Sequence, residues 1–146
     1  MHMQDAQVCI NYGGTMRKTI LMLLLTGMSS NAMAELVQIG GYGALAIYTD
    51  PSNIHKEGDI VRMWNVYNYH IAQRGPGGRV YLSVDEQEEF DCKEKQMRIL
   101  YFSYRAGNMG EGEPVYSKSF SDDIRWDPIE PDSKGERLLL FACSEK

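Results

Sequence analysis

The sequence predicts an α+β domain, in which an antiparallel β-sheet carries a C-terminal α-helix packed on one face. Side chains typical of strands alternate through residues 60–73 and 96–105. A helix-start motif precedes a short apolar run near the C-terminus, within residues 131–142. Several strands followed by one helix are typical of a sheet with a helix on one side.

The first half of the chain contains the longest predicted strand. Short strands are expected at residues 36–39 and 44–48, separated by a glycine-rich break at 40–43. Turns follow at 49–53, where Pro51 restricts φ, and at 57–59. Residues 60–73 have apolar side chains on both faces near their start, which predicts a central strand covered on both sides there. A flexible glycine-rich turn is expected at 74–78.

The second half supplies the remaining strands. Residues 80–84 and 88–92 are predicted to be extended, with acidic residues between them. Phe90 is expected to face the core, and Cys92 should do the same because side chains two residues apart share a face. Residues 96–105 form a strong strand pattern, and 106–110 end it. Residues 114–120 predict an edge strand, because polar side chains alternate after a leading proline.

The predicted helix covers residues 134–143. Ser133 and Glu136 form a capping box, in which Ser133 accepts from the Glu136 N–H and Glu136 bonds back to the start of the helix. A helix places one stripe of small and apolar residues toward the sheet, namely Gly135, Leu138, Leu139, Ala142 and Cys143. The alternative is a buried strand at 137–142, because a short apolar run does not distinguish the two.

Residues 16–34 have the three parts of a secretory signal peptide. A basic start is followed by an apolar run and by a small polar stretch that ends in Ala-x-Ala. The apolar run is shorter than the roughly 20 residues that span a bilayer. We therefore expect residues 1–34 to be an upstream extension plus a signal peptide cleaved after Ala34, and residues 35–146 to form a single exported domain. Either Met1 or Met16 is the true start, and a charged segment at 16–18 favours Met16.

The cysteine count predicts one disulfide. Cys9 leaves with the leader, so Cys92 and Cys143 remain in an oxidising compartment. A bridge between them would close a loop of 51 positions, worth about 4 kcal/mol in the chain-entropy account. The alternative is a redox-active pair, but such pairs usually sit two residues apart at a helix start.

Charge and motifs argue against several function classes. Residues 35–146 contain 13 basic and 19 acidic side chains, a net charge of −6 that disfavours nucleic-acid binding. His2 is lost with the leader, and His55 and His70 lack the spacing of a zinc site. Residues 107–113 lack the terminal Gly-Lys-Ser/Thr of a phosphate loop, and no nucleophile elbow occurs. We expect no enzyme, no cofactor and no metal.

The acidic run at residues 85–91 contains five carboxylates. It is interpreted as a solvated acidic edge, which would discourage aggregation between sheets. A weak calcium site is the alternative, but the run lacks the EF-hand pattern of ligands and glycine.

Aromatic and arginine side chains suggest a partner-binding surface. Tyr, Trp and Arg are the residue types enriched at interface hot spots. They gather on the predicted strands, with Arg62 and Arg105 close by in sequence. The candidate partner-binding residues are Tyr67, Tyr69, Arg98, Tyr101 and Tyr104. The alternative is ordinary sheet packing of these rings.

An ordered set of short motifs resembles the surface-adhesin protein E family of Gram-negative bacteria. The matching segments are residues 46–52, 58–64, 89–94, 98–100, 107–110 and 126–131, followed by Glu136 and Cys143. The resemblance implies an antiparallel sheet with a C-terminal helix across it, pinned by the cysteine pair. It also implies an exported, non-enzymatic domain, since the family's named member attaches to extracellular-matrix glycoproteins of the host.

One departure from that family affects the expected location. A surface lipoprotein needs a cysteine directly after its signal, whereas Glu35 follows Ala34 here. We therefore expect no membrane anchor after cleavage and a periplasmic or secreted protein. The leading hypothesis is a binding module for a matrix glycoprotein, another envelope protein or a second copy of itself, as a homodimer. The alternative is a periplasmic structural or stress-related protein without a specific ligand.

Overall fold

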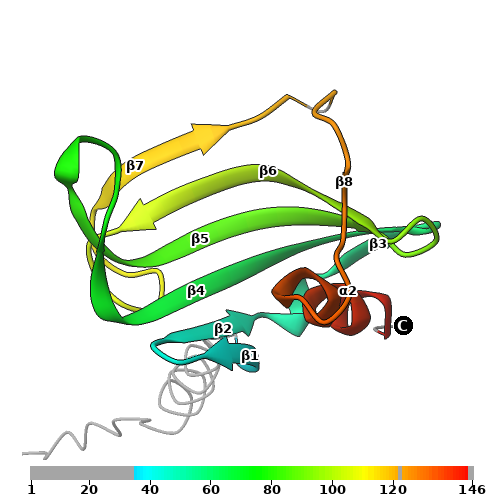
Figure 1. Ribbon diagram of the computed structural model, residues 1–146, viewed down its shortest axis with the longest axis horizontal. Helices are drawn as coiled ribbons and strands as arrows, with labels where there is room; N and C mark the ends of the chain where they lie inside the picture. Colours follow the sequence, from blue (N-terminus) through cyan, green and yellow to red (C-terminus); the bar gives the residue numbers. More distant parts are fainter. Residues whose placement is uncertain (1–34, 122, 145–146) are drawn as a thin grey trace, which may run out of the picture. The chain divides into compact units, whose positions relative to one another are not determined.

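The computed structural model describes residues 35–121 and 123–144, which contain one β-sheet and one α-helix (Figure 1). The elements are β1 (Val37–Tyr42), β2 (Leu45–Thr49), η1 (Pro51–Asn53), β3 (His55–Glu57), β4 (Ile60–Arg74), η2 (Pro76–Gly78), β5 (Val80–Asp91), β6 (Gln96–Arg105), β7 (Pro114–Ser119), β8 (Asp127–Pro128) and α2 (Lys134–Ser144). The strand order is β1-β2-β4-β5-β6-β7, with β3 paired to β4 and β8 paired to β6. All pairs are antiparallel, so the predicted fold class is confirmed.

The long strand and the edge strand lie where the sequence predicts them. β4 has β2 and β3 along one side and β5 along the other, which makes it an interior strand as expected. The expected cover on both faces near its start is wrong, because Val61 and Met63 are buried on one face while Trp64 is 38% exposed on the other. β7 ends the strand order and is therefore an edge. Its polar side chains suit this place, because one side of an edge strand has no backbone partner.

The first hairpin differs from the expectation of a break at residues 40–43. β1 continues through Gly40 and Gly41, which pair with Ile47 and Ala46 of β2. The chain turns only at Gly43, whose φ of 56° is in the left-handed region that favours glycine. Glycine keeps both backbone hydrogen-bonding groups, so the ladder continues through it.

β5 is one strand where the sequence predicts two. Its acidic middle pairs with β4 on one side and β6 on the other, and β6 has one extra residue, Leu100, opposite Gln87 and Glu88. Asp and Glu are poor strand formers when judged alone. Backbone hydrogen bonds from two neighbouring strands outweigh that weak local preference.

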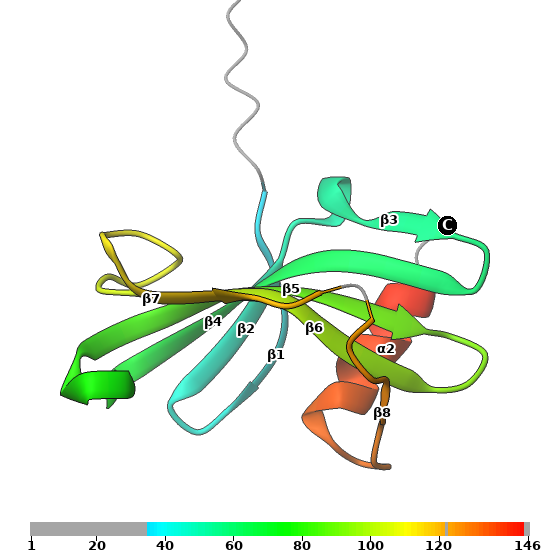
Figure 2. The same ribbon diagram turned by 90° about the horizontal axis from the view of Figure 1, so that it is seen from above.

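The core lies between α2 and one end of the sheet. The stripe predicted for the helix is buried, with Leu138 and Leu139 at 1% and 5% exposure. It packs with alternate strand residues, namely Ile47, Val61, Met63, Tyr67, Val84 and Phe90. Figure 2 shows α2 against one end of the sheet only, in agreement with its contacts to β1, β4 and β5. Within residues 35–121 and 123–144, no helix covers the other end of the same face.

The start of α2 confirms the helix and corrects one detail of its cap. The Glu136 N–H donates to Ser133 Oγ at 3.1 Å, as the capping box predicts. The Glu136 carboxylate accepts instead from the backbone N–H of Asp132, at 2.7 Å, one residue before the expected partner. Asp132, just before the helix, has a φ of 58°, in the left-handed region. The alternative of a strand at 137–142 is excluded.

The predicted disulfide is present. Cys92 and Cys143 are bonded with an S–S distance of 2.03 Å and a Cα–Cα distance of 5.8 Å. The bond joins the last turn of α2 to the residue after β5. It therefore ties the helix to the interior of the sheet.

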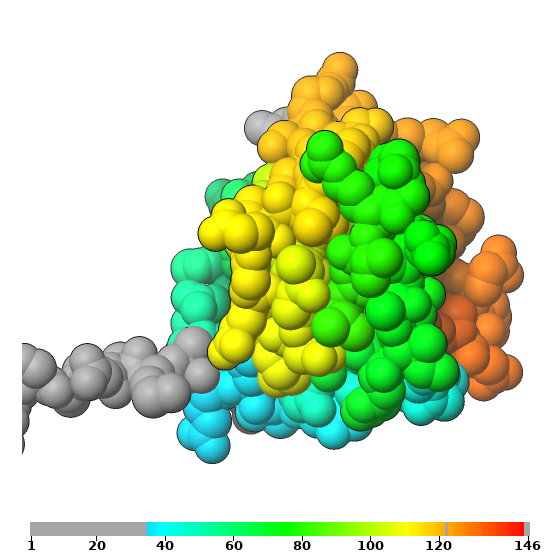
Figure 3. All heavy atoms as spheres, turned by 90° about the vertical axis from the view of Figure 1, so that its left-hand side faces the viewer, coloured from blue at the N-terminus to red at the C-terminus, as the bar shows by residue number. Residues whose placement is uncertain are grey.

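The end of the sheet far from α2 is closed by loops. Figure 3 shows the β4–β5 turn and the segment before β7 side by side at this end. Arg79 in the turn donates to the Val115 carbonyl at 2.7 Å. The loop after β6 folds over the sheet, where Ser83 Oγ donates to the Gly107 carbonyl at 2.7 Å and accepts from the Gly110 N–H at 2.9 Å.

The predicted leader at residues 1–34, with its cleavage after Ala34, lies outside the described residues. Within the described part of the chain, no helix has the length and apolar character that crossing a membrane requires.

Candidate binding face

The face of the sheet opposite α2 displays a row of large polar and aromatic side chains. Side chains alternate along each strand, so the neighbours of the buried core residues point away from the helix. The register places Arg62 of β4 opposite Glu89 of β5, and Glu89 opposite Arg98 of β6. We call this the open face, and its central residues are Arg62, Trp64, Gln87, Glu89, Arg98 and Tyr101.

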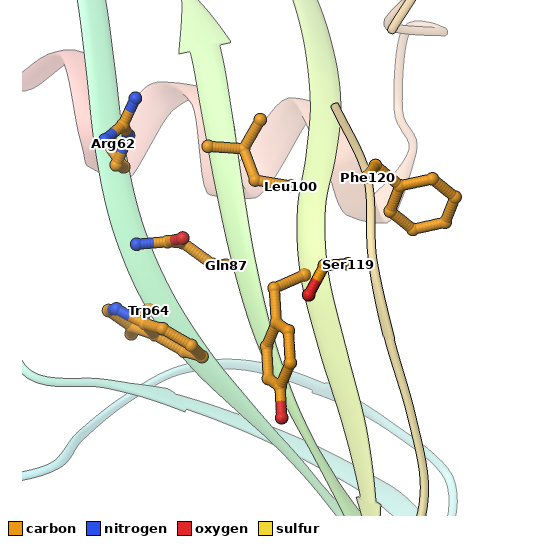
Figure 4. A pocket seen from close by; sticks show the side chains of 7 residues that line it. Arg62, Trp64, Gln87, Leu100, Ser119 and Phe120 are labelled. Carbon is orange, nitrogen blue, oxygen red and sulfur yellow. The ribbon is translucent and has the colours of Figure 1, made fainter. Parts of the chain in front are cut away.

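An aromatic pair lies at the centre of the open face. The rings of Trp64 and Tyr101 meet edge to face, with centroids 5.6 Å apart and planes inclined by 62°. Trp64 remains 38% exposed. The pair lines a groove of about 360 Å³ (Figure 4). The other residues that line the groove are Arg62, Gln87, Leu100, Ser119 and Phe120.

A β-bulge in β6 brings these two rings together. Glu88 pairs with Ile99, but Gln87 pairs with Tyr101, so Leu100 is the extra residue. Gln87 also pairs with Trp64 on its other side. Without the bulge, Leu100 would stand opposite Gln87 and Tyr101 would fall on the opposite face.

A buried carboxylate anchors two arginines beside the groove. Glu89 is only 3% exposed, and it accepts from Arg62 Nε at 2.9 Å and from Arg98 Nε at 2.7 Å. Burial alone would raise the pKa of Glu89, but the hydrogen bonds from the two arginines outweigh it, and the pKa lies below its ordinary value. The guanidinium of Arg98 also lies 4.5 Å from the ring centroid of Trp126. The arginines are therefore held in place before any partner arrives.

Two further hollows adjoin the groove. One, of about 350 Å³, is lined by Arg62, Glu89 and the exposed strand β3. The other, of about 370 Å³, shares Phe120 with the groove and extends over Arg98 toward β8. The open face is thus hollowed over several strands.

No metal chemistry is apparent on this face. His55 and His70 are both exposed. Among residues 35–121 and 123–144, no three His, Cys, Asp or Glu side chains come together in a way that could hold an ion.

The interpretation of residues 85–91 as a solvated acidic edge is wrong, because β5 is an interior strand. Glu88 and Glu89 are 1% and 3% exposed. Glu88 faces the helix, where it accepts a hydrogen bond from Asn65 Nδ2 and bonds from the Tyr67 hydroxyl at 3.0 Å. Burial raises the pKa of Glu88 against the opposing effect of the Asn65 bond, of Lys134 and of Tyr67.

The structure divides the candidate partner-binding residues between the two faces. Arg98 and Tyr101 lie on the open face. Tyr101 lines the groove, and Arg98 lines the hollow beside it. Tyr69 and Tyr104 lie on the helix side, beyond the end that α2 covers, and both are half-buried. Tyr67 is 2% exposed and bonded to Glu88, so it belongs to the core and not to a surface that a partner can reach.

Sequence reasoning missed the residues that complete the open face. Trp64, Gln87 and Trp126 were not among the candidates, although Arg62 and Trp64 share one face of the predicted strand 60–73. That alternation was a usable signal for Trp64. Gln87 shares a face of β5 with Glu89, but only the pairing of β5 with β4 sets it beside Trp64. Trp126 lies outside the predicted strands and reaches this face through its contact with Arg98.

The fold defines a class of small α+β domains, an antiparallel sheet with one end covered by a disulfide-tied C-terminal helix. A family model described as surface-adhesin protein E matches residues 36–144, and the chain belongs to that family. The resemblance found in the sequence is therefore confirmed. The family is one of surface adhesins by its description.

Solved structures of a family namesake show the same fold. A structure of Haemophilus influenzae protein E has a TM-score of 0.56 at 14% sequence identity, over 78% of this chain and 87% of that one. A second, of protein E from non-typeable Haemophilus influenzae, has a TM-score of 0.54 at 14% identity over 79% of each chain. Among curated protein sequences, none matches this chain.

Proposed function

We propose that this chain is an exported, non-enzymatic binding module that attaches to an extracellular-matrix glycoprotein or another envelope macromolecule through its open face. The proposal applies to residues 35–146, after cleavage behind Ala34, in the periplasm or outside the cell. Membership of an adhesin family supports an adhesive role. The Cys92–Cys143 disulfide supports an oxidising compartment.

The observation that carries the proposal is the exposed Trp64–Tyr101 pair beside two anchored arginines. Interface hot spots are enriched in Trp, Tyr and Arg and lie near the centre of a patch, where surrounding residues exclude water. Trp64 is already 38% exposed in a hollow, so a partner side chain can cover it without moving the strand. Glu89 holds Arg62 and Arg98, so binding loses little of their side-chain entropy.

Surface plasmon resonance against a panel of purified matrix glycoproteins tests the proposal, together with a pull-down from envelope extract. Against the partner so found, Trp64→Ala should weaken binding by about 30-fold, the loss of a typical hot spot. Tyr101→Ala should act in the same direction. Both variants leave the buried Glu89 hydrogen bonds intact, so the fold should persist.

Tyr42→Ala is the matched control, because Tyr42 is 43% exposed and lies on β1, away from the groove. Its binding should equal that of the wild type. If folded Trp64→Ala and Tyr101→Ala variants bind as the wild type does, the open face is not the contact surface. Sedimentation of each variant would show whether the partner is instead a second copy of the chain.

A further inference from the structure

A cavity lies on the helix side of the sheet, beside the start of α2. Beyond the helix, three tyrosines from three strands form a row of rings. The Tyr69 and Tyr81 rings meet edge to face at 5.8 Å, and Tyr81 stacks on Tyr104 at 4.4 Å. Phe102 stacks on Tyr104 in turn, at 5.1 Å. These rings wall a cavity of about 200 Å³ that also includes Glu86 and Lys134.

Two carboxyl groups and one ammonium meet at this cavity. Glu86 is half-buried in its lining, and Glu88, two residues along the same strand, is fully buried behind it. Lys134, the first residue of α2, places its ammonium 4.3 Å from the ring centroid of Tyr67. Burial raises the pKa of both carboxyl groups, and the positive charge of Lys134 opposes that rise in each. The chain thus already directs one cation toward this corner of the sheet.

The lining favours a positive ligand. The faces of aromatic rings carry partial negative charge and attract cations within about 6 Å. The half-buried Glu86 carboxyl group adds a partner for a cation once it is ionised, in surroundings that screen its charge less than water does. The volume is below the roughly 300–1,000 Å³ of pockets for drug-sized ligands, so the cavity suits a small head group.

We propose that this cavity is a binding site for a small organic cation, whose ammonium group packs against Tyr69, Tyr81 and Tyr104 and pairs with Glu86. The ligand class includes quaternary ammonium groups and primary amines. The site lies on the opposite side of the sheet from the Trp64–Tyr101 groove and is independent of the proposed adhesive function. Lys134 competes with the ligand for Glu86.

Binding at this site is coupled to a proton. Burial, followed by the charge of Glu88, raises the pKa of Glu86 to about 8 against the opposing effect of Lys134. A bound cation stabilises the ionised carboxylate, so affinity should rise with pH up to about 8 and then level off. The ionisable groups that face Glu86 or line its side of the sheet are Tyr67, Tyr69, Tyr81, Glu88, Tyr104, Tyr116, Lys118 and Lys134.

An NMR titration with choline tests the site. Choline should give saturable shifts in the backbone signals around Tyr69, Tyr81 and Tyr104. Its uncharged isostere dimethylbutanol should bind much more weakly. Glu86→Gln and Tyr81→Leu should each weaken choline binding by about five- to thirty-fold. Glu86→Gln should also abolish the dependence on pH, whereas the control Glu94→Gln, at an exposed acid in the β5–β6 turn, should change nothing.

Lys134→Met provides a test that leaves the acid and the rings unchanged. Removing the competing ammonium should tighten choline binding. A separate titration with butylammonium compares the affinity for a primary amine with that for the quaternary ammonium of choline. The proposal is overturned if choline gives no saturable shifts near the cavity, or if dimethylbutanol binds equally well. Unchanged affinity in a folded Glu86→Gln variant overturns it too.

Discussion

Reducing the Cys92–Cys143 disulfide is predicted to lower the free energy of unfolding by about 4 kcal/mol. The bond closes a loop of 51 positions, and the chain-entropy relation gives that value for a loop of this length at 25 °C. The Cα–Cα distance of 5.8 Å lies within the ordinary range for disulfides, so the native backbone has no need to move when the bond forms. The loss is a large part of the roughly 5–15 kcal/mol by which a domain is stable.

Urea denaturation with and without a reductant measures this loss. The midpoint should fall, and the dependence on urea should steepen, because the reduced unfolded chain exposes more surface. The melting temperature should drop by about 15 °C for a domain of this size. A Cys92→Ala/Cys143→Ala double variant is the control and should not respond to the reductant. A loss below about 1 kcal/mol would refute the entropic reasoning for this loop.

Two further perturbations test the packing of α2 and the charge beneath it. Leu138→Ala should cost about 2–5 kcal/mol in urea denaturation, because Leu138 is 1% exposed. Leu140→Ala, at 64% exposure, should stay within about 0.5 kcal/mol of the wild type, and equal losses would contradict the helix orientation. The pKa of Glu86 rises on folding from 4.5 to about 8, so its contribution to stability is present below pH 4.5 and is lost as pH rises through about 8. In the Glu86→Gln variant, the free energy of unfolding from urea denaturation should fall less between pH 4.5 and about 8 than in the wild type. A wild-type free energy of unfolding that does not change over this pH range would contradict the burial argument.

Much of the fold could be predicted because its signals are local. The strand at 96–105 matches β6 at both ends, because its strand-forming side chains are contiguous, although the bulge at Leu100 breaks their alternation. The capping box located the start of α2, and its apolar stripe identified the buried side. The disulfide followed from a count of cysteines and an inferred compartment. Each of these predictions needs only residues that are close in sequence or few in number.

The acidic run shows where such reasoning fails. Residues 85–91 look like a solvated edge in sequence, because carboxylates are rarely buried without partners. The partners come from elsewhere in the chain, with Arg62 and Arg98 on one face and Asn65 and Tyr67 on the other. No local pattern in β5 reveals that β4 and β6 will supply them.

The sequence by itself determined the class of fold, the start of the C-terminal helix, the cysteine pair and the choice of Tyr and Arg as candidate contacts. Only the tertiary structure decided which of those side chains share a surface. Alternation says which residues of one strand point the same way, but it does not say which way faces the helix. The bulge at Leu100 then sets Tyr101 beside Trp64 on the open face and leaves Tyr104 on the helix side. Register is a property of two paired strands, and neither strand contains it alone.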